Sequence, residues 1–565
     1  MLPHRPITKQ LSNLEISQAA KPLQIIEIAR RAGLRLEEIE MYGSYKAKVL
    51  LRGLERVQVR PQGRLILVTA MTPTEFGEGK TSTAIGLTEA MGSQRKRVML
   101  CLREPSIGPI FGVKGGACGS GYAQILPMED INLHFTGDIH AVGTAHNLLT
   151  ALVENHIQHD NALGIDPDHI LWRRVSEIPD RNLRHVQTGL GGHGYLSRET
   201  GFDITVASEV MAILALASDF ADLKRRLGRI VIGKTKDGKP VTAGEINAVG
   251  AMALLLREAI CPNLVQTLEG QPTFIHTGPF ANIAHGTASV LAHRMALHMA
   301  DYCVTECGFA TDLGFEKFCD IVAPSAGFKP EVAVVVVTAR ALKVHGGLTS
   351  AQAMDGENIR AIQQGFANLE KHLQIVKRFG LTPVVAINRF RADTDAELRL
   401  IQEHCISLNV RAAVSTVSEQ GGEGGLNLAQ EVAAALQEKS AQYKPLYDAA
   451  QSIPEKIEAI AREIYGADGV IYEGSAHADI EWLTKNGFAG LPINMAKTQL
   501  SLSDDPARKG APSGWKLRVR ELRVAAGAGF IVVLTGNLLT MPGLPKQPLA
   551  EKLDVDDKGR VSGLF

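Results

Sequence analysis

The amino-acid sequence predicts an α/β protein built on a parallel sheet. Short runs rich in Val, Ile and Leu alternate with segments of helical periodicity, the order typical of β-α-β units. The first unit comprises a strand over 64–70, a helix over 81–92 and a strand over 97–102. Ligands of such sheets bind beyond the carboxyl ends of the strands, so we expect the functional site there.

The remaining elements follow the same alternation. Further strands are expected over 229–233, 272–278, 331–337, 383–388, 410–415 and 529–536, and helices over 244–260, 287–302 and 427–441. A chain of 565 residues is too long for one hydrophobic core. The order of elements predicts a large α/β domain over 1–330, followed by two smaller α/β domains over 331–455 and 456–565.

Composition excludes several functional classes. Sixty basic residues balance sixty acidic ones, so no overall charge favours a nucleic acid or an anionic membrane as partner. The first residues lack the apolar segment of a secretory signal, and the longest apolar run, "EVAVVVVTARAL", is too short to cross a bilayer. None of the seven cysteines forms a CxxC pair. We therefore expect a cytoplasmic enzyme with reduced thiols.

A phosphate-binding loop is predicted between the first strand and the first helix. The stretch "TAMTPTEFGEGKTSTAIGL" (69–87) places Gly77 and Gly79 before Lys80, which opens the helix. Backbone N–H groups and the positive helix end would face an anion, Lys80 would add a charge, and Thr81 could ligate Mg²⁺. The usual motif has a glycine where this chain has Thr74. A chance glycine-rich turn is the alternative, but strand, turn and helix all lie in the required order. We therefore expect the domain over 1–330 to be a P-loop NTPase-like nucleotide-binding and catalytic domain.

The segment after the second strand carries further candidates for catalysis. Arg103 and Glu104 directly follow that strand, so they should lie in the same crevice as the loop. An arginine there can neutralise a second anion, and carboxylates such as Asp138 can hold Mg²⁺ or orient a nucleophile. Of the nearby histidines, His146 is expected to make an ordinary hydrogen bond in the core.

Several long blocks of the chain resemble formate–tetrahydrofolate ligases. These blocks are "TPTEFGEGKTSTA", "LREPSIGPIFGVKGG", "YAQILPMEDINLHFTGDIHA", "FDITVASEVMAIL", "GPFANIAHG", "GFATDLGFEKF", "MAKTQLSLSDDP" and "MPGLPKQP". The resemblance runs in order from "MYGSYKAKV" (41–49) to the C-terminal "SGLF". The Thr-Pro-Thr form of the loop is this family's own variant, so Thr74 fits the resemblance.

The resemblance implies an ATP-dependent ligation. ATP with Mg²⁺ would phosphorylate formate, and the secondary amine of tetrahydrofolate would attack the resulting formyl phosphate to give formyltetrahydrofolate, ADP and phosphate. Positioning and charge neutralisation would carry most of the first step. Some members of the family require a monovalent cation, and members form homotetramers or homodimers.

The resemblance also implies roles for individual residues. The ATP site would comprise Thr74, Glu75, Phe76, Gly77, Glu78, Gly79, Lys80, Thr81 and Phe309. Catalysis would fall to Lys80, Arg103, Glu104 and Asp138, with Thr81 and Glu104 as candidate Mg²⁺ ligands. The domain over 331–455 would contribute to the folate site through Phe390 and the position of Ser418.

One departure from the family leaves an alternative open. The family carries a tryptophan shortly before "GGEGG", where this chain has Ser418. Half of a stacking clamp for folate would then be missing. Weak folate binding or a rearranged partner aromatic would each explain this, as would a paralogue that activates another small carboxylate or formylates another amine.

Two further readings of glycine-rich stretches are less favoured. The G-x-G-x-x-G at 189–194 resembles a dinucleotide fingerprint, but the segment before it is a poor strand and no helix follows. A regulatory P-loop protein would usually carry a second lysine early in the loop, and none lies between Thr69 and Gly79.

Overall fold

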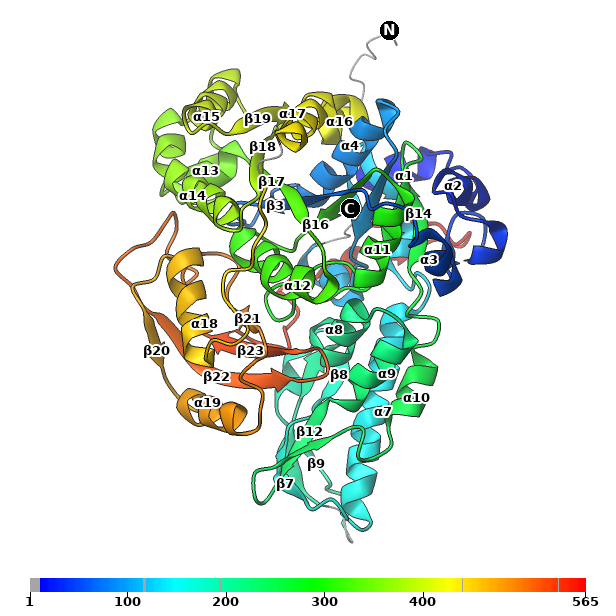
Figure 1. Ribbon diagram of the computed structural model, residues 1–565. Helices are drawn as coiled ribbons and strands as arrows, with labels where there is room; N and C mark the ends of the chain where they lie inside the picture. Colours follow the sequence, from blue (N-terminus) through cyan, green and yellow to red (C-terminus); the bar gives the residue numbers. More distant parts are fainter. Residues whose placement is uncertain (1–10, 115–117, 193–195, 439–440, 537, 565) are drawn as a thin grey trace.

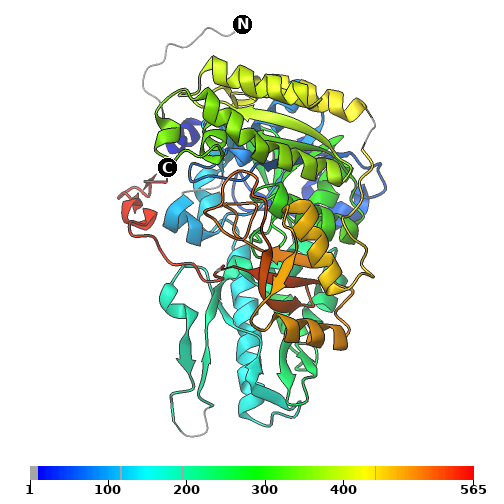
Figure 2. The ribbon, with the colours of Figure 1, turned by 90° about the vertical axis from the view of Figure 1, so that its left-hand side faces the viewer.

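A large sheet occupies the upper half of the molecule in Figure 1, with an elongated lobe below it and a smaller sheet at its side. The structure is a computed structural model that describes residues 11–114, 118–192, 196–438, 441–536 and 538–564. In Figure 2 the lobe extends downwards away from the large sheet. Within the described ranges, no helix is long and apolar enough to cross a bilayer.

Twelve strands of the described residues form the large sheet. In spatial order they are β1 (Ile39–Met41), β2 (Ala47–Val49), β14 (Asn263–Thr267), β15 (Pro272–Ile275), β4 (Val98–Leu102), β16 (Tyr302–Glu306), β3 (Arg64–Ala70), β17 (Pro330–Val337), β18 (Thr382–Asn388) and β19 (Arg411–Ser415), with β6 (Ala123–Leu126) on β14 and β5 (Gly119–Ser120) on β6. From β15 to β19 all neighbours are parallel, whereas the strands from β1 to β14 pair antiparallel. The sheet is therefore mixed, and its parallel part brings the ends of β4, β16, β3, β17, β18 and β19 to one edge.

Strand β3 shows why the sheet is buried on both faces. Leu65 and Leu67 point into one hydrophobic core, and Ile66 and Val68 point into another. The first core includes α11 (Val290–Met299) and α14 (Ile359–Arg378), and the second includes α4 (Lys80–Ser93) and α17 (Leu426–Gln437). A strand covered on both faces needs an almost continuous apolar run, which "RLILVTA" supplies.

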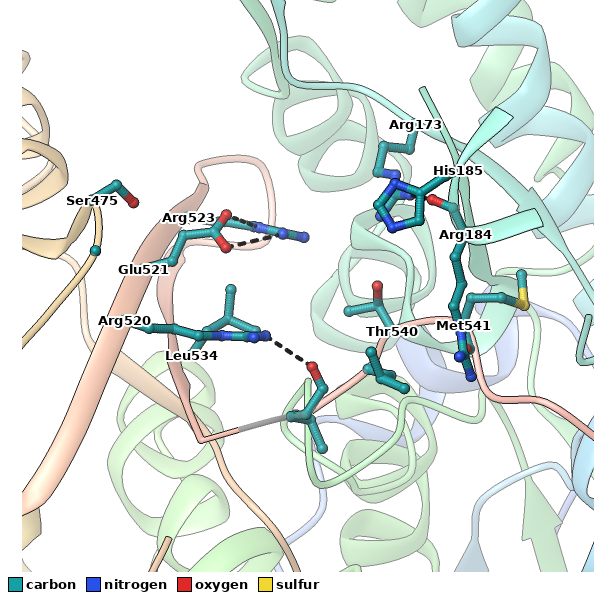
Figure 3. A pocket seen from close by; sticks show the side chains of 13 residues that line it. Arg173, Arg184, His185, Ser475, Arg520, Glu521, Arg523, Leu534, Thr540 and Met541 are labelled. Carbon is teal, nitrogen blue, oxygen red and sulfur yellow. Dashed lines mark hydrogen bonds and ion pairs between the residues drawn. The ribbon is translucent and has the colours of Figure 1, made fainter. Parts of the chain in front are cut away.

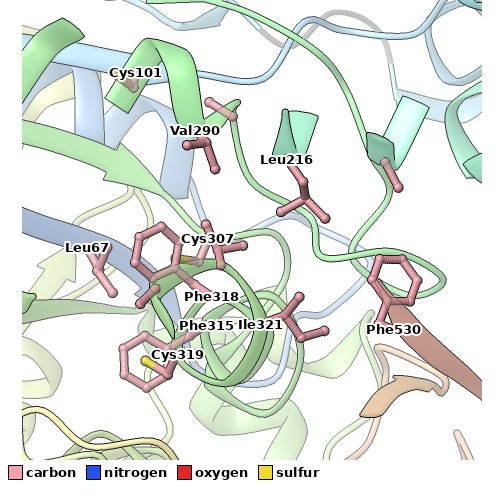
Figure 4. Close-up of a cluster of buried hydrophobic side chains, with 14 of the residues drawn as sticks. Leu67, Cys101, Leu216, Val290, Cys307, Phe315, Phe318, Cys319, Ile321 and Phe530 are labelled. Carbon is pink, nitrogen blue, oxygen red and sulfur yellow. The ribbon is translucent and has the colours of Figure 1, made fainter. Parts of the chain in front are cut away.

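The first of these cores extends beyond the large sheet. Figure 4 shows Leu67 close to Phe315 and Phe318, which belong to the segment after β16. The same cluster of buried side chains includes Phe530, which belongs to the smaller sheet. The smaller sheet and the large one thus share a hydrophobic core.

The lobe and the smaller sheet contain the remaining long elements. The lobe holds α7 (Asp138–Gln158), β7 (Ile165–Ile170), β8 (Arg174–Ser176), β9 (Val186–Thr188), β10 (Arg198–Thr200), β11 (Phe202–Ile204), α8 (Glu209–Leu216), α9 (Phe220–Gly228), β12 (Val231–Thr235), β13 (Pro240–Thr242) and α10 (Val249–Leu255). The C-terminal part holds α18 (Ile453–Ala459), β20 (Val470–Tyr472), α19 (Ala476–Lys485), β21 (Ile493–Ala496), β22 (Leu517–Ala525) and β23 (Phe530–Thr535). Helices α15 (Asp395–Ser407) and α16 (Val417–Gln420) also lie against the large sheet, and α13 (Ala339–His345) packs on α14.

The topology can be compared with the predicted domain boundaries. Strand β17 begins at residue 330 and pairs with β3, so the large sheet continues across the first predicted boundary. The smaller sheet, in the order β20-β22-β23-β21, lies wholly within 456–565. The lobe is inserted between β6 and β14, inside the range 1–330.

Two predicted helices differ from the observed ones. The helix expected over 244–260 is reduced to α10, because Asn247 adopts a left-handed φ of 57° and interrupts the helical backbone before it. The helix expected over 287–302 ends at Met299, and Tyr302 already belongs to β16. A strand that follows a helix after two residues leaves little turn signal in the sequence.

The G-x-G-x-x-G stretch joins two strands of a hairpin. Strands β9 and β10 pair antiparallel on either side of it, and residues 193–195 lie outside the described residues. A dinucleotide fingerprint would instead join a strand to a helix.

The predicted core role of His146 is confirmed. Its ring is buried, stacks on Trp172 at 4.1 Å between centroids, and lies 2.8 Å from the carbonyl oxygen of Arg173 through Nε2. Burial lowers the pKa of His146 to about 4, although the hydrogen bond to Arg173 opposes this shift.

His146 should make the lobe sensitive to acid. Between pH 6.5 and 4 the unfolded chain binds a proton at His146 that the folded chain does not, so the free energy of unfolding falls as the pH falls. Relative to His146→Gln, the wild type should lose up to about 3 kcal/mol between pH 7 and pH 4, measured by urea unfolding. The control is His159→Gln, at an exposed position at the end of α7, which should leave this pH dependence unchanged. Parallel pH curves for wild type and His146→Gln would contradict the assignment.

Candidate active site

The loop between β3 and α4 has the backbone geometry of an anion-binding turn. Gly77 and Gly79 adopt left-handed φ values of 72° and 73°, and Lys80 is the first residue of α4. A Cβ on Gly79 would lie 2.2 Å from Nδ2 of Asn388, which itself donates to the carbonyl of Glu78. Glycine is therefore required at position 79 by both conformation and space.

Thr74 is held in place by Glu78. The backbone N–H and the hydroxyl of Thr74 both donate to Oε1 of Glu78 at 2.8 Å. The other carboxylate oxygen of Glu78 accepts from the hydroxyl of Thr338, which caps α13. Buried Glu78 thus links the loop to Thr338, which follows β17, the neighbour of β3 in the sheet. Thr74 therefore stabilises the loop at the position where the usual motif has glycine.

Lys80, Thr81 and Arg103 converge on one carboxylate, that of Glu306. Nζ of Lys80 lies 3.1 Å and the hydroxyl of Thr81 2.7 Å from its Oε2, and Nη2 of Arg103 lies 3.3 Å from its Oε1. Burial alone would raise the pKa of Glu306, but the charges of Lys80 and Arg103 outweigh it and hold the pKa at about 2. The edge of the sheet therefore carries two cations around one ionised carboxylate.

Glu306 was missed by the sequence reasoning. It is the last residue of β16, which lies between β3 and β4 in the sheet. Its signal in the sequence is an acidic residue at the end of a short apolar run, "YCVTE", but the predicted helix over 287–302 includes the first residue of that run and no strand is predicted over the rest. Recognising β16 as a strand would have placed Glu306 beside the loop.

Glu104 and Asp138 belong to a second, buried group. Asp138 begins α7 and accepts hydrogen bonds from Nζ of Lys48 at 2.7 and 2.9 Å and from Nδ2 of Asn263 at 2.8 Å. Burial and then the charge of Asp138 raise the pKa of Glu104 well above its ordinary value, while Lys48 opposes this. Oε2 of Glu104 is buried without a hydrogen-bond partner among the described residues. Lys48, on β2, was not predicted as a site residue.

An arginine lies between the predicted ATP loop and the predicted folate residue. The guanidinium of Arg340 lies 3.5 Å from the ring centroid of Phe390 and 5.2 Å from that of Phe76. Its Nη2 also donates to the carbonyl of Gly77 at 2.8 Å. Arg340 therefore connects the loop to Phe390, and it covers a face of that ring.

Ser418 lies at the same edge of the sheet but has other neighbours. It is in α16, just beyond the end of β19, and its Oγ lies 3.1 Å from Oγ of Ser120. Ser120 is in turn 2.8 Å from the hydroxyl of Ser82 in the first turn of α4. The backbone carbonyl of Ser418 accepts from the N–H of Tyr122. Three linked hydroxyl groups thus lie at the position where the resemblance to the family implies a tryptophan.

The other predicted residues lie close to these groups. Phe309 is half-buried with a φ of 60°, three residues after Glu306. Gly308 before it is closely packed, since a Cβ there would lie 2.5 Å from Cβ of Ala281 and 3.2 Å from Nη1 of Arg103. Glu75 is exposed on the loop. The structure thus places Thr74 to Thr81, Arg103 and Phe309 around one edge of the sheet.

The candidate Mg²⁺ ligands have separate surroundings. Thr81 contacts Glu306, whereas Glu104 lies within the electrostatic influence of Asp138 and Lys48. In the part of the chain that the structure describes, no group of three or more His, Cys, Asp or Glu side chains is arranged to hold a metal ion. An ion at the loop would thus depend on hydroxyl, carboxylate and substrate oxygens, which Mg²⁺ accepts.

A comparison with protein families agrees with the resemblance of the sequence blocks. The profile of formate–tetrahydrofolate ligases matches residues 11–565, which is nearly the whole chain. The match spans the loop, the Arg103 and Glu306 edge, the buried Lys48 group and the C-terminal sheet alike. The chain therefore belongs to the formate–tetrahydrofolate ligase family, whose members are ATP-dependent ligases.

Proposed function

We propose that the chain joins formate to tetrahydrofolate through formyl phosphate. The observation that carries this proposal is the convergence of Lys80, Thr81 and Arg103 at Glu306, directly beyond a glycine-rich loop. Two fixed cations can neutralise the γ-phosphate of ATP and the carboxylate of formate side by side. The P-loop NTPase-like character of the sheet is part of the same proposal.

The first step is phosphoryl transfer. An oxygen of formate attacks the γ-phosphorus, the bond from that phosphorus to the bridging oxygen breaks, and ADP leaves. Lys80 holds the γ-phosphate, and Arg103 holds formate and then the formyl phosphate made from it. Thr81 and ionised Glu306 supply the oxygen atoms that fit Mg²⁺, which would neutralise phosphate charge when bound.

The second step is acyl transfer to the secondary amine of tetrahydrofolate. The amine attacks the formyl carbon, the bond from that carbon to the phosphate oxygen breaks, and the amine proton must be accepted. Burial and the charge of Asp138 raise the pKa of Glu104 and so favour its protonated form, which suits donation of a hydrogen bond to the developing oxyanion. Asp138, in its ion pair with Lys48, is the carboxylate assigned to receive the proton.

Isotope exchange tests the intermediate directly. ATP carrying ¹⁸O in its β–γ bridge is incubated with the enzyme and formate but without tetrahydrofolate. If formyl phosphate forms reversibly, the label moves from the bridge to the terminal oxygens of the β-phosphate, and it does so only with formate present. The complete reaction with ¹⁸O-formate should carry label into inorganic phosphate. Absence of both transfers would contradict a formyl phosphate intermediate.

Ser418 supports a second candidate. Its hydroxyl lies 3.1 Å from that of Ser120, and a serine supplies no aromatic face for a folate ring. A paralogue of the same fold could activate a different carboxylate or formylate a different amine. Release of ADP measured over a panel of small carboxylates and folates separates the two. Turnover at millimolar formate that does not depend on tetrahydrofolate would favour the paralogue.

Phe390 should matter for folate alone. Phe390→Ala should raise the KM for tetrahydrofolate about fivefold, since a stacked aromatic contributes on the order of 1 kcal/mol. The formate-dependent isotope exchange of ATP should be unchanged, because that reaction needs no folate. Phe390→Tyr keeps the ring and serves as the matched control. A loss of isotope exchange in Phe390→Ala, or an unaltered KM, would remove Phe390 from the folate site.

A further inference from the structure

A cleft rich in arginine lies between the lobe and the smaller sheet. It has a volume of about 440 Å³, within the range of small-molecule sites. Figure 3 shows Arg520 and Arg523 of β22 on one side, and Arg173 and Arg184 of the lobe on the other. None of the residues that line the cleft is among those assigned above to ATP, formate or folate.

Two of the four guanidinium groups have charged partners. Arg173 pairs with Asp203 at 3.1 Å, and Arg523 pairs with Glu521 on its own strand. These pairs leave the local charge near neutral at their own positions. They also fix the two walls of the cleft.

The other two guanidinium groups have only backbone partners in the part of the chain that the structure describes. Nε of Arg184 donates to the carbonyl of Met541 at 2.9 Å, and Nη2 of Arg520 donates to the carbonyl of Leu538 at 2.9 Å. Nε of Arg520 is buried without a hydrogen-bond partner among the described residues. A carbonyl does not cancel a positive charge, so the cleft holds two uncompensated cations, with a donor of one of them unused.

Between these cations the surface is apolar. Leu534, Leu538, Leu539 and Met541 line the cleft together with the arginines. A ligand whose anionic groups are joined by a flexible or aliphatic chain would pair with both cations and cover the apolar surface between them. A single small anion could reach one guanidinium but would leave the other uncompensated.

We propose that this cleft is a binding site for a small polyanion, a molecule with two or more carboxylate or phosphate groups that bridges Arg184 and Arg520. The proposal is independent of the chemistry assigned to the catalytic edge. Arginine binds carboxylates and phosphates through the same charge-assisted hydrogen bonds, so the test needs one probe of each kind.

Calorimetric titration tests the site with two probes, γ-linked triglutamate for carboxylates and inorganic tripolyphosphate for phosphates. Titrations are made with saturating ADP, because tripolyphosphate resembles the phosphate chain of ATP. At least one probe should bind the wild type, and Arg184→Gln/Arg520→Gln should weaken it at least tenfold. Added salt should weaken binding too.

The matched control is Arg181→Gln. Arg181 also donates to a backbone carbonyl of the same C-terminal segment, that of Leu544, but it does not line the cleft. It should bind the probe like the wild type, and all three proteins should keep the same thermal midpoint and the same turnover without probe. Binding by one probe alone identifies the source of the anion. If neither probe binds, or if the double variant binds as well as Arg181→Gln, the cleft is not a polyanion site.

Discussion

Lys80→Ala should lower formate-dependent release of ADP by about 10³-fold, the loss expected when a fixed cation is removed from a transferring phosphoryl group. Lys80 opens α4 and reaches Glu306 with its ammonium group 3.1 Å away. Its side chain is 13 % exposed, so its charge acts in a partly desolvated place. The charge should be worth more in the transition state than in bound ATP, and kcat should fall more than the affinity for ATP.

The control for this variant is Lys96→Ala. Lys96 precedes β4, at the opposite end of the parallel strands from the proposed site. Its replacement removes the same charge as Lys80→Ala but leaves the proposed site untouched. It should retain wild-type turnover. The thermal midpoint of Lys80→Ala should be recorded as well, because Glu306 then keeps only Arg103 as a charged partner among those described. A folded Lys80→Ala protein within tenfold of wild-type turnover would contradict the assignment.

The strand, loop and helix around Lys80 could be predicted because their signals are local. Strand β3 covers residues 64–70 as predicted, and α4 begins one residue before the predicted helix. An apolar run, two glycines and a lysine stand within a short stretch, and each has one structural meaning there. The backbone of Gly79 is left-handed, as such a loop requires.

The missing parts of the site depend on contacts between distant residues. Lys48 and Asp138 are 90 positions apart, and only the pairing of β2 with β14 brings the lysine to the start of α7. Arg340, in α13, reaches the loop although it lies 263 positions from Gly77 in the sequence. No periodicity or local motif reports such contacts. The resemblance to the family pointed to Asp138, but the cation that holds it appeared only with the fold.

Lys48→Met should destabilise the protein by about 3–5 kcal/mol, since it removes one partner of a buried ion pair. The side chains of Lys48 and Asp138 are 1 % and 3 % exposed. Lys48 also donates to the carbonyl of Cys261 and to Oδ1 of Asn263, so its loss strands several acceptors at once. Urea unfolding followed by circular dichroism measures the change in free energy.

Lys46→Met is a matched control two residues away. Lys46 pairs with Asp130 at 2.8 Å, but the Asp130 side chain is 47 % exposed, so this pair should contribute only about 0–1 kcal/mol.

The double variant Lys48→Met/Asp138→Asn should recover part of the stability lost in Lys48→Met, because no buried charge then remains without its partner. Strictly additive losses, or equal losses for Lys46→Met and Lys48→Met, would mean that Asp138 does not depend on Lys48. Because the charge of Lys48 opposes the raised pKa of Glu104, its removal should raise that pKa further. The buried lysine therefore links the stability of the sheet edge to the titration of Glu104.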